Sequence, residues 1–388
     1  MSEKPNLFKF ATSELSQDAV LAYMLAWADP EHAETTKLHK LGRDLLFALL
    51  AESERTIERI GPDSEETPKD EAVRIKEAIR QIKTEGIKTV EVKRQDNNID
   101  VSVDINESLF VIVEDKTETM RHGDQIRRYK EAAKQRFESD GKSREVVAVY
   151  LKTGNESASY HPAPERASCF FRADVLGVLD KNQNTGSDII EEFQIHLKRL
   201  EDDTKSFKES KLVALDDQGN SEDGWSWYAH QGYFMHLEQK LDWDEKGWGY
   251  TPNPAGGHLE FYSGARCCER MNDPKPHLAL QVIYNKGLYI RIVRLGDWEK
   301  VYAHFLHPFF EKIAKCAEAK RFDGLHVRKP SRFGTGASAN VAQIYFEAEG
   351  DGYRATNREG KIDLVATVNR LNQAMEFMRY ICDNIQSD

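Results

Sequence analysis

The sequence is poor in cysteine and has no long apolar run. Its 388 residues include five cysteines, an odd number with no CxxC pair. This argues against a zinc finger or a disulfide framework and predicts reduced thiols. No apolar run approaches the ~20 residues of a membrane span, and the stretch MSEKPNLFKF lacks the apolar core of a signal peptide. These absences predict a soluble, cytoplasmic protein with no membrane partner.

Net positive charge is also missing. The formal charge is -11 at pH 7, although nucleic-acid binding usually draws on contacts between basic side chains and phosphates. The basic residues are clustered, however: residues 121–144 hold eight Lys or Arg against four acids, and residues 311–332 hold seven against three. A basic strip is therefore available for phosphate contacts. The alternative is that these charges only solvate a helix face, which applies to Arg127, Arg128, Lys134 and Arg136.

Residues 98–129 hold the densest group of candidate site residues. Two alternating runs, IDVSVDI and LFVIVEDK, flank the tripeptide Asn-Glu-Ser and predict an antiparallel hairpin. Alternation places Asp100 on the polar face of the first strand, and Glu114 and Lys116 on one face of the second. Pairing would bring two carboxylates close together, which requires a cation or a proton between them. Hard oxygen ligands of this kind favour Mg2+ or Mn2+.

The hairpin and the segment after it resemble the core of the PD-(D/E)XK nuclease superfamily. In that core an Asp on one strand is followed by Glu-x-Lys at the end of the next strand and by a helix with Gln-x-x-x-Tyr. The matching residues are Asp100, Glu114, Lys116, Gln125 and Tyr129. The proline of the family name is absent before Asp100. The resemblance extends over about the first 175 residues. It implies a restriction-endonuclease-like α/β fold, in which helices flank a central mixed sheet.

The resemblance also assigns roles to these side chains. Asp100, Glu114 and Glu14 are expected to hold Mg2+ or Mn2+, the last because its segment resembles the first helix of the family. Lys116 and Gln125 are expected to position the attacking water or the phosphate. Three further residues are expected to contact the substrate: Tyr129, Arg128 and Gln17.

Two of these residues have ordinary structural alternatives. Glu14 lies in the first turn of a predicted helix that Thr12 or Ser13 can cap, so its charge can simply complement the helix dipole. Tyr129 lies on an apolar helix stripe and can pack against the sheet as any aromatic residue would. The sequence leaves both alternatives open.

The predicted elements follow the order of an α/β core. The expected helices and strands are a helix over about 12–29, helices over 38–50 and 70–84, a strand over 88–93, the hairpin, the helix of Gln125 and a β-branched strand over 145–151. A charged helix over 187–207 ends the first domain, which is placed at residues 1–210, and an acidic stretch over 214–224 is expected to be a linker.

Residues 224–388 are expected to form a second, α+β domain. An aromatic-rich helix is followed by strands with Pro and Gly turns, by helices over about 297–320 and 361–383, and by the strand VAQIYFEAE between those helices. The aromatic side chains suit stacking on bases or binding of a protein partner. Aromatic strands more often form a core, so this alternative stays open.

The expected function is metal-dependent hydrolysis of phosphodiester bonds, as the resemblance implies. DNA is the expected substrate, cut by an endonuclease of restriction or anti-phage defence that acts as a homodimer or with an accessory defence-system subunit. The alternative is a scaffold that binds nucleic acid or protein and whose site is latent without a partner. The acidic net charge favours the scaffold. The retained Asp, Glu and Lys favour the nuclease, because unused carboxylates would only repel one another.

Overall fold

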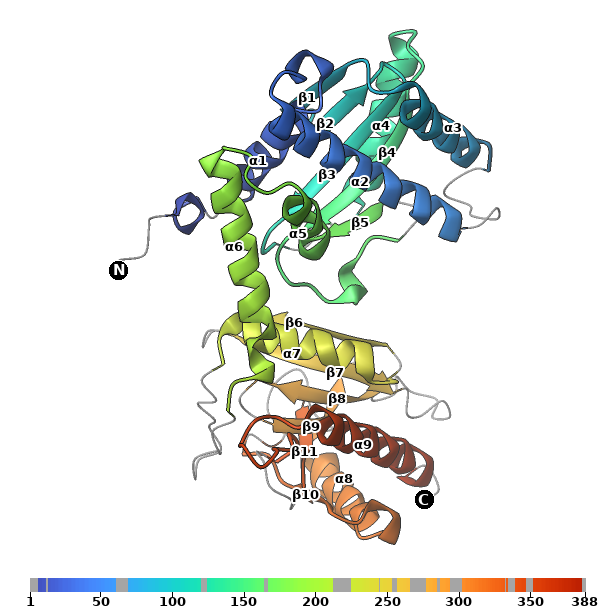
Figure 1. Cartoon of the computed structure of the whole chain (residues 1–388). Helices are drawn as coiled ribbons and strands as arrows, with labels where there is room; N and C mark the ends of the chain where they lie inside the picture. The colour runs from blue at the N-terminus through green and yellow to red at the C-terminus, as the bar shows by residue number, and fades with distance from the viewer. Residues whose placement is uncertain are drawn as a thin grey trace. The chain divides into compact units, whose positions relative to one another are not determined.

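The chain folds into two units in a computed structural model (Figure 1). The first unit comprises Met1–Asn155 and Tyr160–Asp202, and the second comprises Glu156–Ser159 and Asp203–Asp388. The structure describes residues 6–11, 13–60, 69–119, 124–163, 167–211, 225–243, 245–252, 257–265, 277–284, 287–293, 302–331, 333, 339–346 and 352–385. The predicted first domain, residues 1–210, thus includes two segments, 156–159 and 203–210, that the structure groups with the second unit.

The first unit is built on a five-stranded mixed sheet in the order β1-β2-β3-β4-β5. Strands β1, β2 and β3 are antiparallel, whereas β3, β4 and β5 are parallel. The elements are α1 (Glu14–Ala26), α2 (Thr36–Ile60), α3 (Lys69–Glu85), β1 (Val90–Asp96), β2 (Ile99–Ile105), β3 (Leu109–Lys116), α4 (Gln125–Ser139), β4 (Glu145–Lys152), β5 (Ser168–Phe171), α5 (Arg172–Lys181) and α6 (Asp188–Lys205). The expected mixed sheet with flanking helices is confirmed.

The predicted hairpin is β2 and β3. Its register runs from Val101 opposite Val113 to Ile105 opposite Leu109. Asn106 and Glu107 have φ angles of 52° and 53°, and two successive left-handed residues give a turn whose twist matches that of the strands. All eight residues of β3 are buried, because this strand lies at the centre of the sheet with layers on both faces.

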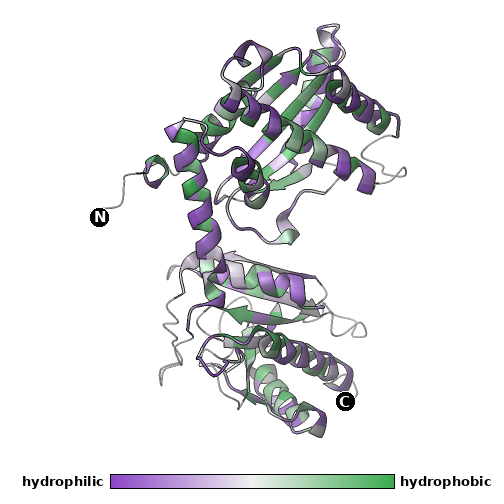
Figure 2. Cartoon of the chain, viewed as in Figure 1, coloured by the Kyte–Doolittle hydropathy of each residue, from purple (hydrophilic) through white to green (hydrophobic). Residues whose placement is uncertain are grey.

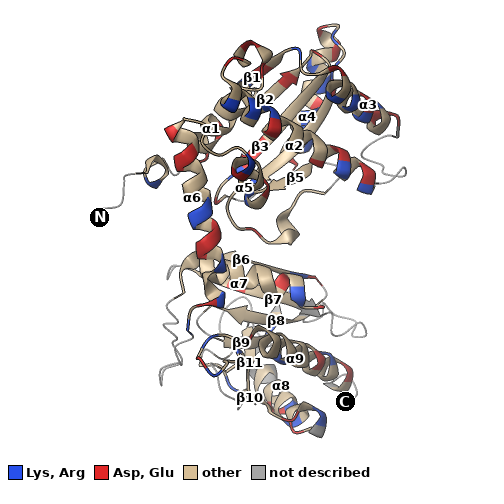
Figure 3. Cartoon of the chain, in the orientation of Figure 1, with Lys and Arg blue, Asp and Glu red and all other residues tan. Residues whose placement is uncertain are grey.

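Two apolar clusters hold the layers of the first unit together. Helices α1, α2, α3, α5 and α6 share one cluster with the strand residues Val101, Val113 and Val149. Helix α4 covers the opposite face, where Ile126 and Phe137 pack among other strand side chains. Figure 2 shows the apolar colour concentrated on the strands. On α3, acidic and basic side chains alternate (Figure 3), as predicted for a surface helix.

The second unit is an antiparallel six-stranded sheet in the order β10-β11-β9-β8-β7-β6. Its elements are α7 (Trp227–Lys240), β6 (Lys246–Thr251), β7 (His258–Ala265), β8 (His277–Ile283), β9 (Gly287–Val293), α8 (Tyr302–Ala317), β10 (Leu325–Arg328), β11 (Ala339–Phe346) and α9 (Leu364–Ile385). Helices α7, α8 and α9 pack in one cluster with the same sheet face, for example with Leu280, Ile290 and Ile344. The expected α+β architecture is confirmed.

Two predictions from the sequence are wrong, and a third concerns residues outside the described ranges. Helix α2 continues to Ile60, ten residues beyond the predicted end, because its apolar stripe is followed by a charged but helix-favouring stretch. The predicted linker over 214–224 lies outside the described residues. Cys169 and Cys316 are free, but Cys382 is disulfide-bonded, so the prediction of reduced thiols is wrong there. None of the helices in the described ranges is long and apolar enough to span a membrane.

Candidate active site

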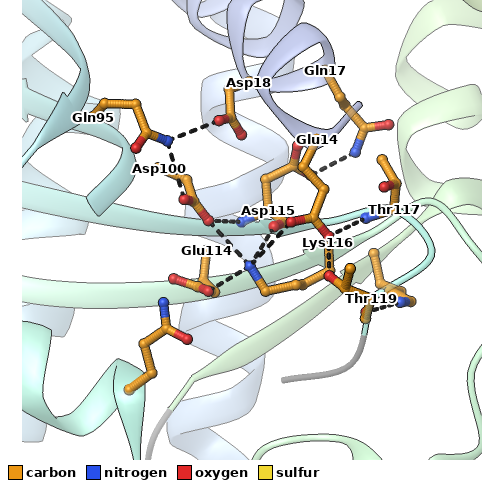
Figure 4. A network of polar contacts seen from close by, with 12 residues as sticks. Glu14, Gln17, Asp18, Gln95, Asp100, Glu114, Asp115, Lys116, Thr117 and Thr119 are labelled. Carbon is orange, nitrogen blue, oxygen red and sulfur yellow. Dashed lines mark hydrogen bonds and ion pairs between the residues drawn. The ribbon is translucent and has the colours of Figure 1, made fainter. Parts of the chain in front are cut away.

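Four charged side chains meet where β2 begins and β3 ends, next to the start of α1 (Figure 4). The ammonium of Lys116 lies 2.7 Å from Glu114 Oε1, 3.4 Å from Asp100 Oδ2 and 3.9 Å from Glu14 Oε2. It also donates a 2.8 Å hydrogen bond to the carbonyl of Asp115. Three carboxylates from three different elements therefore surround one cation, and all four residues were predicted to belong to the site.

The carboxylates of Asp100 and Glu14 are held by neighbouring groups. Asp100 Oδ2 accepts a 3.0 Å hydrogen bond from the backbone N–H of Asp115, and Oδ1 accepts one of 3.3 Å from Gln95. Glu14 Oε1 accepts from the backbone N–H of Thr117 at 3.3 Å and from the hydroxyl of Thr119. Glu14 thus reaches from α1 to the segment after β3, and it does more than complement the dipole of an exposed helix end.

Burial dominates the electrostatics of Glu114. The residue is 1 % exposed, and burial together with the nearby charges of Asp100 and Glu14 raises its pKa to about 7, although Lys116 opposes the shift. For Lys116, burial favours the neutral form. The three carboxylates outweigh it, led by Glu114, and raise the pKa of the ammonium. The lysine therefore stays charged and balances the acidic group.

The acidic group has the chemistry of a divalent-metal site. No three Asp, Glu, His or Cys side chains of the described ranges are already arranged around a common metal position, because the carboxylates converge on Lys116 instead. Glu114 Oε2 is nevertheless buried and accepts no hydrogen bond from any described residue. A buried carboxylate oxygen without a donor needs a cation or a proton. The carboxylates of Asp100, Glu114 and Glu14 fit Mg2+ or Mn2+.

The sequence comparison agrees with this geometry. A family model described as the PD-(D/E)XK nuclease superfamily matches residues 5–214, more than half of the chain. The chain belongs to the PD-(D/E)XK nuclease superfamily. No curated protein and no solved structure matches the chain. Membership supports nuclease activity, and nucleases of this superfamily generally use divalent metals, which agrees with the donor set around Lys116.

The nuclease motif continues on α4. Gln125 Nε2 donates a 2.8 Å hydrogen bond to Tyr129 Oη, so the two motif residues contact each other. Among the described residues neither one hydrogen-bonds to Asp100, Glu114 or Lys116. Tyr129 also packs against the apolar cluster between α4 and the sheet. This contact supports the packing alternative for Tyr129.

Most of the basic strip around α4 is already paired within the protein. Lys134 contacts Glu71 at 2.7 Å and Arg136 contacts Asp96 at 3.3 Å. For these two residues the structural alternative therefore holds. Arg128 and Lys142 are exposed and make no ion pair with another described residue, so their charges are available to a phosphate.

Gln17 lies apart from any surface that could receive a substrate. It is 5 % exposed. Its Nε2 donates to Asp115 Oδ1 at 2.6 Å, and its Oε1 accepts from Thr153 Oγ1 at 2.7 Å. Both ends of the amide are thus used inside the protein, which argues against the expected substrate contact.

The sequence reasoning missed four residues that support the site: Asp18, Gln95, Asp115 and Thr153. Gln95 bridges the carboxylates of Asp18 and Asp100 at 3.0 Å and 3.3 Å. Asp115 is the middle residue of Glu-Asp-Lys, and a charged residue at a position expected to face the core was the available signal. The partners across the fold could not be inferred, since 98 residues separate Gln17 from Asp115.

Proposed function

We propose that the first unit hydrolyses phosphodiester bonds with Mg2+ or Mn2+ held by Asp100 and Glu114, with help from Glu14. The observation that carries this proposal is the convergence of three carboxylates on Lys116, at 2.7 to 3.9 Å. Such an ion supplies positive charge at the phosphate and acidifies an attacking water. The arrangement is consistent with the nuclease family of the chain.

The other side chains have roles that follow from their positions. The ammonium of Lys116, which lies 2.7 Å from Glu114, would be free to orient the attacking water or to bind a phosphate oxygen if Glu114 held a metal. Gln125, steadied by its hydrogen bond to Tyr129, orients the same groups. Arg128 contributes a phosphate contact, and Tyr129 adds a hydroxyl near the substrate path.

We further propose that DNA is the substrate of this cytoplasmic enzyme and that it acts as an endonuclease in restriction or anti-phage defence. Cutting both strands of a duplex requires two active sites, which favours a homodimer or a complex with an accessory defence subunit. The bond between phosphorus and the 3′ oxygen would break, leaving a 5′-phosphate.

The second unit is proposed to recognise the nucleic acid. One row of paired residues crosses five strands of its sheet: Tyr262, Gln281, Tyr289, Gln343 and Arg328. These residues alternate with core side chains and so lie on the face opposite to α7, α8 and α9. Tyrosine rings stack on bases and a guanidinium binds phosphate. The amide of Gln281 is buried and bonds to Glu260 and Arg291, so this residue supports the row from within. This chemistry suits a single strand better than an aliphatic protein surface.

The alternative function is a scaffold with a latent site. Its supporting observations are the net charge of -11 and the position of the Lys116 ammonium between the carboxylates. In a scaffold, Lys116 would remain paired with Glu114, and Mg2+ or Mn2+ would leave the thermal stability of the protein unchanged.

The test is cleavage of plasmid and single-stranded DNA by the full chain in Mg2+, Mn2+ or EDTA. The wild type is expected to cut only with metal, and Lys116→Ala is expected to lose at least ~100-fold in rate. Lys88→Ala is the control, because Lys88 is exposed and its ammonium pairs with the exposed carboxylate of Glu85, away from the site. Cutting in EDTA or by Lys116→Ala would refute the mechanism. A silent wild type that still binds DNA would favour the scaffold.

A further inference from the structure

Asp115 lies between two site residues but faces away from them. Its neighbours Glu114 and Lys116 point to one side of β3, and Asp115 points to the other side, toward α1 (Figure 4). Its backbone N–H donates to Asp100 Oδ2 at 3.0 Å, and its carbonyl accepts from Lys116 Nζ at 2.8 Å. The peptide groups of Asp115 therefore orient both the proposed metal ligand Asp100 and the lysine.

The side chain of Asp115 fixes this stretch of backbone to α1. The residue is fully buried, and its Oδ1 accepts from Gln17 Nε2 at 2.6 Å. Gln17 in turn accepts from Thr153 Oγ1 at 2.7 Å, and the backbone N–H of Thr153 donates to the carbonyl of Lys116 at 3.1 Å. The hydrogen bonds form a closed circuit that joins α1, the end of β3 and the segment after β4.

The same face of α1 carries the third proposed ligand. Glu14, Gln17 and Asp18 are three and four residues apart and so lie on one side of the helix. Asp18 Oδ2 accepts a 3.0 Å hydrogen bond from Gln95 Nε2 of β1. The bonds of Gln17 to β3 and of Asp18 to β1 therefore determine how far Glu14 reaches toward Lys116, from which it is separated by 3.9 Å.

We propose that Gln17 and Asp115 are positioning residues that hold Glu14, Asp100 and Lys116 in the arrangement that binds metal. Neither residue touches the metal or the substrate. This inference rests on the proposed function of the same site and assigns the residues that preorganise it. Partners of this kind, outside the ligands themselves, typically contribute 10- to 100-fold to metal affinity.

The test measures Mn2+ affinity of the full-length protein by titration calorimetry. Gln17→Met keeps the side-chain volume but removes both hydrogen bonds, and Asp115→Val removes the acceptor. Each is expected to weaken Mn2+ binding by about 10-fold or more. Asp115→Asn is expected to stay within about 3-fold of wild type, because its amide oxygen can still accept the hydrogen bond from Gln17.

A double-mutant cycle locates the effect. If Gln17 acts through Glu14, Gln17→Met should weaken Mn2+ binding much less when Glu14 is already replaced by Gln. Thr153→Val removes only the hydrogen bond that Thr153 donates to Gln17, and it should also weaken Mn2+ binding. This variant replaces Gln17→Met in the test if Gln17→Met does not fold. Thr56→Val, a change at a buried threonine of α2, is the matched control.

Two results would overturn the inference. One is a folded Gln17→Met or Thr153→Val protein that binds Mn2+ as tightly as the wild type. The other is an Asp115→Asn protein as impaired as Asp115→Val, which would make the Asp115 carboxylate itself a ligand. Failure of the proposed function is separate, because it would appear as wild-type protein that binds Mn2+ but cuts no nucleic acid.

Discussion

Glu114 is buried next to three other charged side chains, those of Glu14, Asp100 and Lys116. Its carboxyl has a pKa of about 7, raised by burial and by the charges of Asp100 and Glu14. The usual pKa of this carboxyl group is 4.5. At pH values between 4.5 and about 7, Glu114 therefore keeps its proton in the folded protein without bound metal but loses it in the unfolded chain. Stability therefore falls as pH rises through this range. A metal that binds the ionised carboxylate must displace that proton.

This linkage predicts a pH-dependent metal affinity. With a pKa of about 7, proton competition should make Mn2+ binding about tenfold weaker at pH 6 than at pH 8. The measurement is the rise in melting temperature at a fixed Mn2+ concentration across that range. Glu114→Gln should abolish the rise at both pH values, whereas the surface variant Glu77→Gln should behave as wild type. An equal Mn2+ effect at pH 6 and pH 8 would contradict the account.

At the level of single residues the sequence predicted the charged centre well. Strand alternation placed Asp100, Glu114 and Lys116 together, and they are in contact. Asp115 was not predicted to support the site, because strand alternation placed it on the face that packs in the core. Its hydrogen bond from Gln17 of α1 explains why an acidic residue occupies this buried position. Which residue of α1 that partner is depends on helix packing, and no local sequence pattern encodes it.

Helix α1 carries Glu14 into the site, and its position depends on how closely α2 approaches it. Gly42 of α2 lies against the end of α1: a Cβ atom there would come within 2.6 Å of the Ala28 nitrogen and of the Met24 carbonyl oxygen. These neighbours are backbone atoms, so they cannot move aside without moving α1. The close contact of the two helices therefore requires glycine.

Gly42→Ala is predicted to separate α1 from α2. Such overpacking typically costs about 1–3 kcal/mol, which corresponds to a melting temperature lower by a few degrees in a unit of this size. Mn2+ binding should also weaken, because Glu14 moves with α1. Gly177→Ala in α5 is the matched control, since a Cβ there meets nothing within 4 Å. A Gly42→Ala protein as stable as Gly177→Ala would show that the helices are not held this closely.

At the level of elements, long periodic segments were predictable and short ones were not. The hairpin, α1, α4 and β4 lie where alternation and helical spacing put them. Strands β5 and β10 have four residues each, too few for a periodic signal. Their existence depends on pairing with β4 and β11, and pairing between distant segments is a tertiary property.

Across the whole molecule, charge and chemistry are divided between the two units. The first unit holds the acidic site, and the second presents the row that ends in Arg328. Because the chain as a whole is acidic, affinity for nucleic acid should depend more on stacking than on total charge. The predicted separation of an α/β unit from an α+β unit is consistent with this division.

Replacing members of the row should affect binding and leave metal binding unchanged. Tyr262→Ala is predicted to weaken binding of a single-stranded oligonucleotide by about 1–3 kcal/mol. Arg328→Ala should make the plot of the logarithm of the binding constant against the logarithm of salt concentration less steep by about one unit, as expected for the loss of one phosphate contact. Arg358→Ala, at an exposed position outside the row, removes the same charge and should change neither. Normal oligonucleotide binding by Tyr262→Ala would exclude the row as a base-stacking surface and would point to a protein partner instead.

Asp100 and Glu114 are proposed to bind a divalent metal next to Lys116. The most direct measurement is the anomalous scattering of Mn2+ in a crystal of the full-length protein grown with MnCl2. We expect a peak bonded to oxygens of Asp100 and Glu114, with Lys116 Nζ moved away from its 2.7 Å contact with Glu114. A crystal with saturating Mn2+, no peak at these carboxylates and Lys116 still paired with Glu114 would contradict it.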